Sequence, residues 1–406
     1  MSSLEERFEQ ACAARDIPQA VLIASNKGTS ACTFKYERAF GKRSLREGAD
    51  QSPLQLDAIM WIASCTKVMT SLAAVQCVER GQLALDAPVY DILPELRHLE
   101  ILDGFDDEGK AILRKNHTPI TLRLLLTHSS GIAYDDMYPP LRAWRKSLGQ
   151  KPGGSTLEQR FSYPLVFEPG TQWMYGAGVD WAGRMVERVT NMTLEGYMKQ
   201  HIWGPLGIKD MTFHLSSRPD LAARLTDLSG RRRPQAKAQY MRSPFLFKDV
   251  VDDLGGQGVY ATAQELHKFV HGLLTCEDDE RLLKRAALAQ FFSPSLTESA
   301  RASLNKVMKA PADERVVSAA GFAEETGIDW GLGGLVLTTD IPGSMHAGTQ
   351  LWHGLPNLTW WVDRKAGLCA VYASQLYPPA DGKVVELQEL FAREMYSRSG
   401  ARQQKL

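Results

Sequence analysis

The sequence lacks an excess of charge of either sign. Its 406 residues contain 47 lysines and arginines and 47 aspartates and glutamates, so the formal net charge at neutral pH is zero. The largest basic stretch is the short "GRRRPQAK" from Gly230 to Lys237, which interrupts a polar region and is expected to be a solvated loop. This balance gives no electrostatic reason to expect nucleic acid or an anionic membrane as a partner.

Long apolar runs are also missing. No uninterrupted run approaches the roughly 20 residues that a membrane-spanning helix needs. The opening "MSSLEERFEQACAARD" is charged from Glu5 onward and has no apolar core of the kind that a secretory signal requires. Ser3 lies three residues before Glu6, a capping-box pattern that predicts a helix over about residues 3–15. We therefore expect a cytoplasmic protein without a membrane partner.

Cysteines are few and scattered. They show no CxxC spacing and no clustered histidine, which argues against a disulfide framework and a zinc site and favours reduced thiols and no metal or cofactor. Cys65 is adjacent to Ser64 and is the one cysteine that competes with it as a nucleophile. It lacks a neighbouring histidine, and one step along a helix turns it away from the face of Ser64. The six cysteines are Cys12, Cys32, Cys65, Cys77, Cys276 and Cys369.

The pattern of elements indicates an α+β fold. Strand-like runs occur near both ends of the chain, and helical periodicity fills the middle, so we expect one antiparallel sheet built from both termini and a mainly helical lobe. The expected division is a discontinuous sheet domain, 1–82 and 316–406, and a lobe, 83–315. The cleft between the two is the default place for a site.

Individual runs give more detailed expectations. "AVLIASNK" and "CTFKYERAFG" read as strands joined by a turn at "GTSA", and a helix from Ser64 ends near Gly81. Towards the C-terminus, "GLGGLVLTTD", "TQLWHG", "NLTWWVDRKAG" and "LCAVYASQ" read as strands, followed by a helix over about residues 382–397. The short turn "DRKAG" predicts that the last two strands pair antiparallel.

Two SxxK patterns are present. Ser303 and Lys306 lie in the polar "RASLNKVMKA", and one or two such patterns are expected by chance in a chain of this length. Ser64 and Lys67 instead follow the apolar "AIMWIA" at the start of a buried helix. Positions i and i+3 share a helix face, so Lys67 can reach the Ser64 hydroxyl. A buried lysine at a helix N-terminus has a lowered pKa and can act as the base that a serine nucleophile needs. From these residues alone, a helix that merely starts on a serine remains the alternative.

Further motifs carry a resemblance to a known family. "SCTK", a tyrosine on a loop of the helical lobe and a glycine-bearing strand near the C-terminus resemble the three elements of the class C β-lactamase and penicillin-binding-protein superfamily, and "LLLTHSSGI" resembles a linking segment of its esterase branch. "WMYGAGVDWAGRMVERVT", "GPLGIKDMTF", "WGLGG" and "VDRKAGLCAVYASQL" resemble the fungal lovastatin-type enzymes, in the same order and with similar spacing. Within the superfamily, the chain most resembles the branch of fungal lovastatin-type acyltransferases and esterases, from about Glu6 to the C-terminal helix. The resemblance implies a β-lactamase/transpeptidase-like fold.

The resemblance also implies roles for individual residues. Ser64 would be the nucleophile, Lys67 the general base and Tyr175 a second proton carrier, with a phenol pKa that falls beside the cationic lysine. The backbone amides of Ser64 and Leu355 would form the oxyanion hole.

The implied pocket departs from the family pattern. At "LWHGLPN", Trp352, His353 and Gly354 precede Leu355, and His353 and Leu355 replace glycines. His353 either contacts substrate or is a structural strand histidine. Tyr377 and the tryptophans Trp360 and Trp361 would add apolar surface, although strand alternation turns some of them to the core.

Two further residues are expected to have structural roles, and one polar group that many relatives carry is absent from the site. His128 in "LTHSSG" is expected to be a bonded loop histidine and not a catalytic one. Asp180 is expected to cap a helix that begins at Trp181. Ala177 stands where many relatives carry an asparagine, so one polar group is absent.

The expected function is acyl transfer through an acyl-enzyme at Ser64. The donor would be a small-molecule thioester or ester, including one carried on an acyl-carrier domain of a megasynthase, and the acceptor a hydroxyl of a polyketide-like natural product in secondary metabolism. The main alternative is an esterase that hydrolyses such a product. A β-lactamase or D,D-peptidase and a non-catalytic binding protein are the remaining alternatives.

Overall fold

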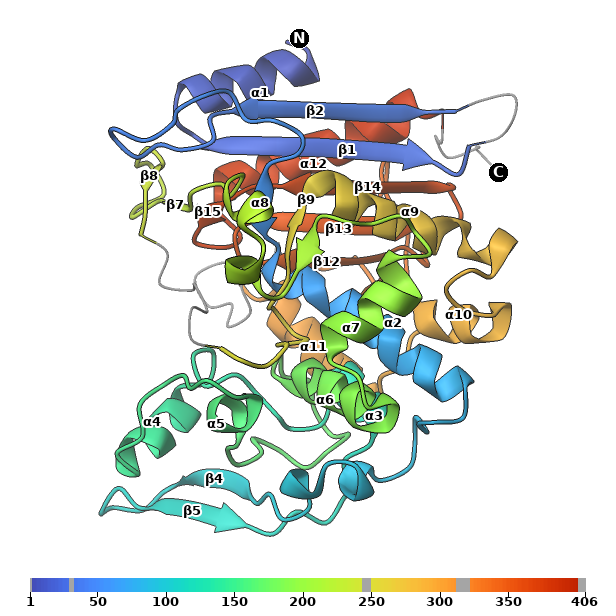
Figure 1. The fold of residues 1–406 in the computed structure, drawn as a ribbon. Coiled ribbons are helices and arrows are strands. Elements are labelled where there is room, and N and C mark those ends of the chain that lie inside the picture. The colour runs from blue at the N-terminus through green and yellow to red at the C-terminus, as the bar shows by residue number, and fades with distance from the viewer. Residues whose placement is uncertain (1, 29–32, 243–249, 312–321, 401–406) are drawn as a thin grey trace.

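A seven-stranded antiparallel sheet forms the centre of the molecule. The computed structural model describes residues 2–28, 33–242, 250–311 and 322–400. The strand order is β10-β11-β12-β13-β14-β1-β2, so the N-terminal hairpin pairs with the C-terminal strands through β1 and β14, as expected (Figure 1). The strands are β1 (Gln19–Asn26), β2 (Lys35–Gly41), β10 (Ile328–Trp330), β11 (Leu335–Leu337), β12 (Gln350–Gly354), β13 (Leu358–Asp363) and β14 (Leu368–Ala373).

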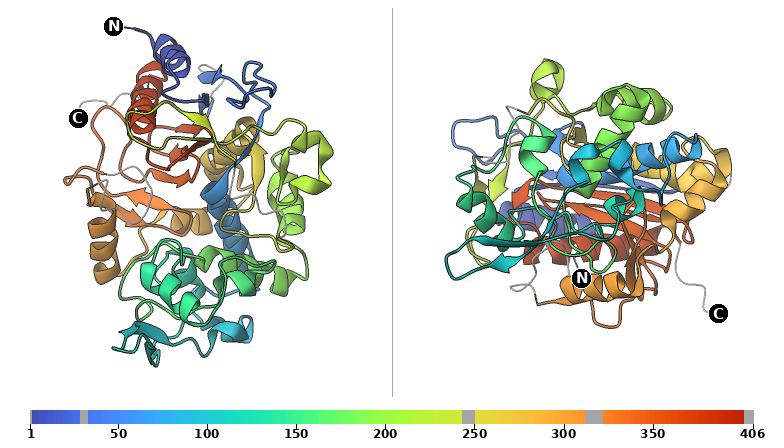
Figure 2. Two further views of the ribbon diagram at one scale, coloured as in Figure 1. Left: turned by 90° about the vertical axis from the view of Figure 1, so that its left-hand side faces the viewer. Right: turned by 90° about the horizontal axis from the view of Figure 1, so that it is seen from below.

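Helices cover both faces of this sheet. On one face lie α1 (Leu4–Ala13) and α12 (Gly382–Arg398), and on the other α9 (Ala263–Asp279) packs against β13, β14 and β1 (Figure 2). The central strands β13 and β14 are buried on both sides and rich in β-branched and aromatic residues for that reason. The helix α2 (Thr66–Glu79) has a buried surface nearly all round, and it runs from the sheet towards the lower lobe.

The middle segment of the chain, residues 83–315, supplies most of the remaining helices. The helices are α3 (Leu122–Leu126), α4 (Pro139–Ser147), α5 (Leu157–Phe161), α6 (Gly178–Thr190), α7 (Leu194–Met198), α8 (Pro219–Ala222), α10 (Arg285–Phe292) and α11 (Glu298–Lys309), with short turns at Ala63–Cys65 (η1), Val89–Asp91, Pro94–Leu96, Lys199–Trp203 and Leu215–Ser217. Helices α3 to α7 and α11 lie below the sheet in Figure 1, whereas α8 is drawn at the height of the sheet and α9 packs on it. The boundary between the sheet domain and the helical lobe therefore stays a proposal.

Three small sheets complete the fold. One of them, β3-β9-β6, leads directly into the turn before α2 and so fixes where that helix begins. Their strands are β3 (Ile59–Trp61), β4 (Ile101–Phe105), β5 (Ala111–Arg114), β6 (Met211–Thr212), β7 (Ser229–Gly230), β8 (Gln239–Tyr240), β9 (Tyr260–Thr262) and β15 (Leu376–Tyr377).

Several local predictions are confirmed. The capping box of Ser3 and Glu6 is present at α1, and Gly81 follows α2 with a φ of +73°. The antiparallel pairing across "DRKAG" is that of β13 with β14. The predicted turn "GTSA" lies largely outside the described residues. In the described chain no helix has the length and apolar character needed to cross a membrane.

The basic stretch at Gly230 is largely exposed, as expected, but its first arginine is not. Arg231 is buried and forms an ion pair with Asp381, and its guanidinium also donates to the carbonyls of Asp16 and Ala236. The carboxylate and two carbonyls together compensate the buried charge, which a solvated loop would leave to water. Arg231 therefore joins the segment directly after β7 to the start of α12.

Candidate active site

Ser64 lies in the tight turn η1 between β3 and α2. Ala63, the residue before it, has a φ of +45°, in the left-handed region that is costly for any residue except glycine. Such strain persists where neighbours hold the backbone, here through Ile62, whose N–H donates to Val259 O at 3.1 Å and whose carbonyl accepts from Cys65 N at 3.0 Å. The turn leaves Ser64 partly exposed at the wall of a cavity, whereas Cys65 is buried.

Lys67 is buried beneath Ser64. Its Nζ lies 3.4 Å from Ser64 Oγ, and it donates to the hydroxyl of Tyr134 at 3.0 Å and to the carbonyl of Gly256 at 2.8 Å. Burial lowers the pKa of Lys67 to about 8, even though the carboxylate of Asp180 opposes this shift. A lysine with this pKa releases its proton near neutral pH and meets the requirement for a general base.

Asp180 is not the predicted helix cap. The helix α6 begins at Gly178 with Ala177 as its N-cap residue, and Asp180 lies inside the first turn. Its buried carboxylate accepts from the hydroxyl of Tyr134 at 2.9 Å and from Gly256 N at 2.9 Å. The expectation was wrong because the carboxylate serves two groups from distant segments instead of its own helix end.

Tyr134 and Gly256 are residues that sequence reasoning missed. A Cβ at Gly256 would lie 2.2 Å from the nearer Asp180 oxygen and 2.7 Å from the Tyr134 hydroxyl, so only glycine fits beside them. The hydroxyl of Tyr134 accepts from Lys67 and donates to Asp180, which connects the lysine to the buried carboxylate. The sequence signal that could have identified Tyr134 is its position three residues after the glycine that ends "THSSG".

Tyr175 lies in the loop before α6, beside the serine and the lysine. Its hydroxyl accepts from Trp352 Nε1 at 2.9 Å, and Lys67 Nζ lies 4.5 Å from the centre of its ring. The pKa of Tyr175 is raised, which corrects the prediction that it falls. Burial is the dominant cause, and hydrogen bonds with Ser64 and Trp352 lower the pKa only in part. A neutral phenol is therefore the resting form and can donate its proton.

His128 holds the loop of Tyr175. Its Nδ1 accepts from Gly176 N at 3.3 Å, and its ring packs on that of Tyr175 with centroids 4.5 Å apart. Burial lowers the pKa of His128 well below its usual value, so the ring is neutral. This arrangement fits the expected bonded loop histidine.

Strand β12 delivers the residues expected for the oxyanion hole and pocket. A Cβ at Gly354 would lie 2.5 Å from Ile62 O and 3.2 Å from Cys65 Sγ, so the glycine allows the strand end to approach η1. Leu355 follows it and lines the same cavity as Ser64. Trp352 reaches Tyr175 from this strand.

His353 and Tyr377 lie away from the cavity of Ser64. His353 points to the opposite face of the sheet, where its Nδ1 and Thr359 Oγ1 are 2.9 Å apart. Tyr377 lies in β15 and does not line the cavity either. Trp360 and Trp361 are both buried in the core on opposite faces of β13. None of the four expected pocket residues thus lines the cavity of Ser64, although Trp352 bonds to Tyr175 and Gly354 lets β12 approach η1.

The cavity in front of Ser64 has a volume of about 380 Å³. Four charged side chains contribute to its lining, namely Asp135, Asp136, Arg145 and Arg160. Of these, Arg145 donates to Asp135 at 2.9 Å and to the carbonyls of Lys151 and Arg160. Much of the remaining lining is apolar or aromatic. The lining includes Trp61, Ala63, Tyr134, Met137, Phe161, Tyr175 and Leu355.

One cluster in the described chain has side chains that suit a metal ion, namely Glu195, His214 and Asp253. None of the three lines the Ser64 cavity. His214 Nε2 lies 2.6 Å from Asp253 Oδ1, and Glu195 accepts from Phe213 N at 2.6 Å. The cluster is therefore an internally bonded group that joins α7 to the segment after β6.

Comparisons with known proteins agree with this geometry. The family model described as Beta-lactamase matches residues 4–393. Monacolin J acid methylbutanoyltransferase from Aspergillus terreus is 36% identical over 97% of this chain and 95% of its own length. Lovastatin esterase from Penicillium rubens is 39% identical over 91% of this chain and 92% of its own length. A mutant of simvastatin synthase from Aspergillus terreus superposes with a TM-score of 0.89 at 36% identity, over 98% of this chain and 94% of that one.

Proposed function

The chain belongs to the beta-lactamase family, and from this premise we propose that Ser64 transfers an acyl group from a thioester or ester to a hydroxyl acceptor. The observation that carries the proposal is the 3.4 Å contact between Lys67 Nζ and Ser64 Oγ at the wall of the cavity. The expected resemblance to acyltransferases and esterases is confirmed by the two relatives, and the fold by the superposition.

In the first step, Ser64 Oγ attacks the carbonyl carbon of the donor while its proton passes to the neutral amine of Lys67. The amides of Ser64 and Leu355 donate to the oxyanion that forms. The intermediate then collapses with cleavage of the bond to the thiolate or alkoxide. This leaving group takes the proton of Tyr175, which regains one from the Lys67 ammonium.

The second step reverses the first with a new nucleophile. An acceptor hydroxyl attacks the acyl-enzyme and gives its proton to Tyr175 while Tyr175 passes its own proton to the neutral amine of Lys67. Ser64 then leaves with the proton of the Lys67 ammonium, which returns both groups to their starting forms. Trp352 donates to the Tyr175 oxygen and stabilises the charge that forms on it transiently. If water attacks instead, the same groups release an acid, so transferase and esterase differ in which nucleophile reaches the ester.

The proposed substrates follow those named for the relatives. The acyl donor is a short branched thioester or ester, and the acceptor is a hydroxyl of a polyketide-like product such as the monacolin named for one relative. We include in this proposal a donor carried on an acyl-carrier domain and a cytoplasmic location. The five cysteines within the described residues are free thiols, which suits a reducing compartment.

Intact mass after incubation with 2-methylbutanoyl thioester tests the mechanism. We expect an acyl adduct on the wild type and on Ser303→Ala, because Ser303 lies on α11 and its Oγ donates to the carbonyl of Trp173. We expect none on Ser64→Ala. An undiminished adduct on Ser64→Ala contradicts the serine mechanism.

Partition of the acyl-enzyme distinguishes the two activities. The thioester is offered free and on a carrier domain, with a polyketide alcohol present or absent, and ester and acid products are counted. Ester formation that exceeds hydrolysis supports the transferase, and acid alone supports the esterase. Rapid hydrolysis of a chromogenic cephalosporin would instead favour a β-lactamase.

A further inference from the structure

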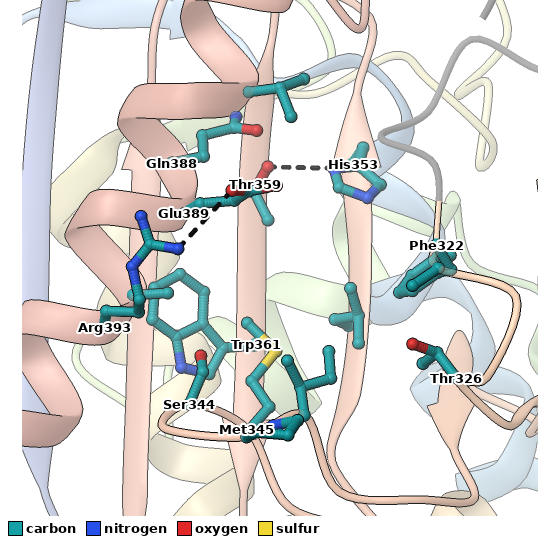
Figure 3. Close-up of a pocket in the computed structure, with 16 residues that line it drawn as sticks. Phe322, Thr326, Ser344, Met345, His353, Thr359, Trp361, Gln388, Glu389 and Arg393 are labelled. Atoms are coloured by element: carbon teal, nitrogen blue, oxygen red, sulfur yellow. Dashed lines mark hydrogen bonds and ion pairs between the residues drawn. The ribbon is translucent and has the colours of Figure 1, made fainter. Parts of the chain in front are cut away.

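A second cavity lies behind strand β12, on the face of the sheet opposite Ser64. Its volume is about 290 Å³, at the small end of the range of roughly 300–1,000 Å³ that is usual for ligand pockets. Strands β12 and β13 form its floor and α12 forms its roof, as Figure 3 shows. The cavity shares none of its lining residues with the cavity in front of Ser64.

The strand register explains why this floor is separate from the active site. His353 lies opposite Thr359, and Leu351 lies opposite Trp361. Because side chains alternate along a strand, these four point to one face and Trp352 points to the other, where it meets Tyr175. The floor therefore consists of two cross-strand pairs with mainly apolar surface.

The roof carries both apolar and polar side chains, and large apolar residues lie at the ends. Along α12 the lining positions are spaced three or four residues apart, as on one helix face. Ile341, Met345 and Phe322 close the ends. The roof residues are Val385, Gln388, Glu389, Ala392 and Arg393.

Charge at the opening is balanced. Arg393 and Glu389 form an ion pair of 3.7 Å, and both side chains are more than half exposed, at 57% and 62%. The two charges therefore compensate each other, and neither is available to bind an ionic ligand inside the cavity.

One polar atom of the floor lacks a partner. His353 Nδ1 is bonded to Thr359, whereas Nε2 is buried and makes no hydrogen bond to any described residue. Burial lowers the pKa of His353 to about 4, so the imidazole is neutral at physiological pH. Buried polar atoms are nearly always bonded, to protein, water or ligand, which makes this nitrogen the polar anchor of the cavity.

We propose that this cavity binds a small neutral apolar molecule with a single hydrogen-bonding group, of the class of medium-chain alcohols, with that group at His353 Nε2. The volume sets the size, the walls select an aliphatic body, and the neutral imidazole selects an uncharged polar end. The site is distinct from acyl transfer at Ser64, because it lies on the other side of the sheet.

Crystals of Ser64→Ala grown with 8-bromo-1-octanol test the location. This variant removes the nucleophile, so the result does not depend on whether the protein transfers acyl groups. We expect an anomalous bromine peak inside the cavity behind β12. Bromine found only in the Ser64 cavity, or nowhere on the protein, overturns the proposal.

Calorimetric titration with 1-octanol tests the binding in solution. We expect saturable binding that falls at least tenfold in Ala323→Trp, which fills the cavity from its exposed rim, and severalfold in His353→Phe, which removes the nitrogens. The control Leu355→Trp fills the Ser64 cavity and should leave the affinity unchanged. Octanoate should bind at least tenfold more weakly than 1-octanol.

Circular dichroism establishes whether each variant is folded. If His353→Phe does not fold, Ala323→Trp still tests the proposal. Binding that is unaffected by Ala323→Trp but lost in Leu355→Trp places the alcohol in the wrong cavity and contradicts the proposal. Absence of saturable binding contradicts it as well.

Discussion

The chain contains the same SxxK spacing twice, at Ser64 and at Ser303, and the two sites differ in nearly everything else. Lys67 is buried, contacts Ser64 Oγ and has a pKa lowered to about 8. Lys306 is exposed on α11, and Ser303 bonds the carbonyl of Trp173. Spacing thus places two side chains on one helix face, but burial and neighbouring groups decide whether the lysine can act as a base.

The difference also shows what the surrounding fold supplies. Around Lys67, three distant segments contribute the Tyr134 hydroxyl, the Gly256 carbonyl and the Asp180 carboxylate. These groups compensate a buried cation that would otherwise be costly.

Removal of the base should separate the two sites most clearly. In Lys67→Met the rate of acyl adduct formation should fall by about 10²–10⁴, since general base catalysis contributes about that much. The matched change Lys306→Met should leave the rate within twofold. The measurement is the time course of adduct mass with a thioester in excess. Equal losses in both variants would show that lysine burial is not the deciding difference.

Loss of the Tyr175 hydroxyl should have the next largest effect. Tyr175→Phe keeps the packed ring but removes the hydroxyl that we propose carries the proton, and we expect kcat to fall by about 10² with KM little changed. Trp352→Phe removes only the donor to that hydroxyl and should reduce kcat by about tenfold. Steady-state kinetics with a chromogenic ester measures both, and a larger loss in Trp352→Phe would reverse the assigned roles.

Much of this contrast was predictable from the sequence, and the reasons are local. The apolar approach to Ser64, the capped helices and the alternating strands follow from short-range patterns that the structure keeps. The resemblance supplied Tyr175, which spacing alone does not distinguish from a packing tyrosine.

The remainder depends on long-range packing. Tyr134, Asp180 and Gly256 meet only in the fold, and nothing in their local sequence shows that they share a hydrogen-bond chain. Alternation along β12 predicts two faces but not which of them meets the cavity, so His353 was misplaced relative to Trp352. The direction of the Tyr175 pKa shift depends on whether burial or charge dominates, and burial dominates here.

Close approach of β12 to η1 provides a third test. In Gly354→Ala the new Cβ would lie 2.5 Å from Ile62 O, so the strand must move and carry the Leu355 amide away from Ser64. We expect kcat/KM to fall by about tenfold, a moderate loss because one oxyanion donor is displaced and not removed. Gly343→Ala is the matched control, since a Cβ there meets no atom within 4 Å, although its φ of +72° makes a small loss of stability expected. Activity of Gly354→Ala equal to that of the control would mean that Leu355 does not serve as a donor.

The smallest expected effect concerns the pH at which Lys67 becomes a base. The wild type should gain kcat/KM as pH rises and level off above an inflection near pH 8, because the neutral amine is the active form and its pKa is about 8. The Asp180 carboxylate favours the ammonium form and so raises that pKa. In Asp180→Asn this attraction is lost, and the inflection should move to lower pH, while the amide can still accept from Gly256 N. Asp220→Asn changes an exposed carboxylate paired with Arg218 and should leave the inflection in place. If the inflection stays near 8 in Asp180→Asn, the carboxylate does not tune Lys67, and burial alone accounts for the difference between Lys67 and Lys306.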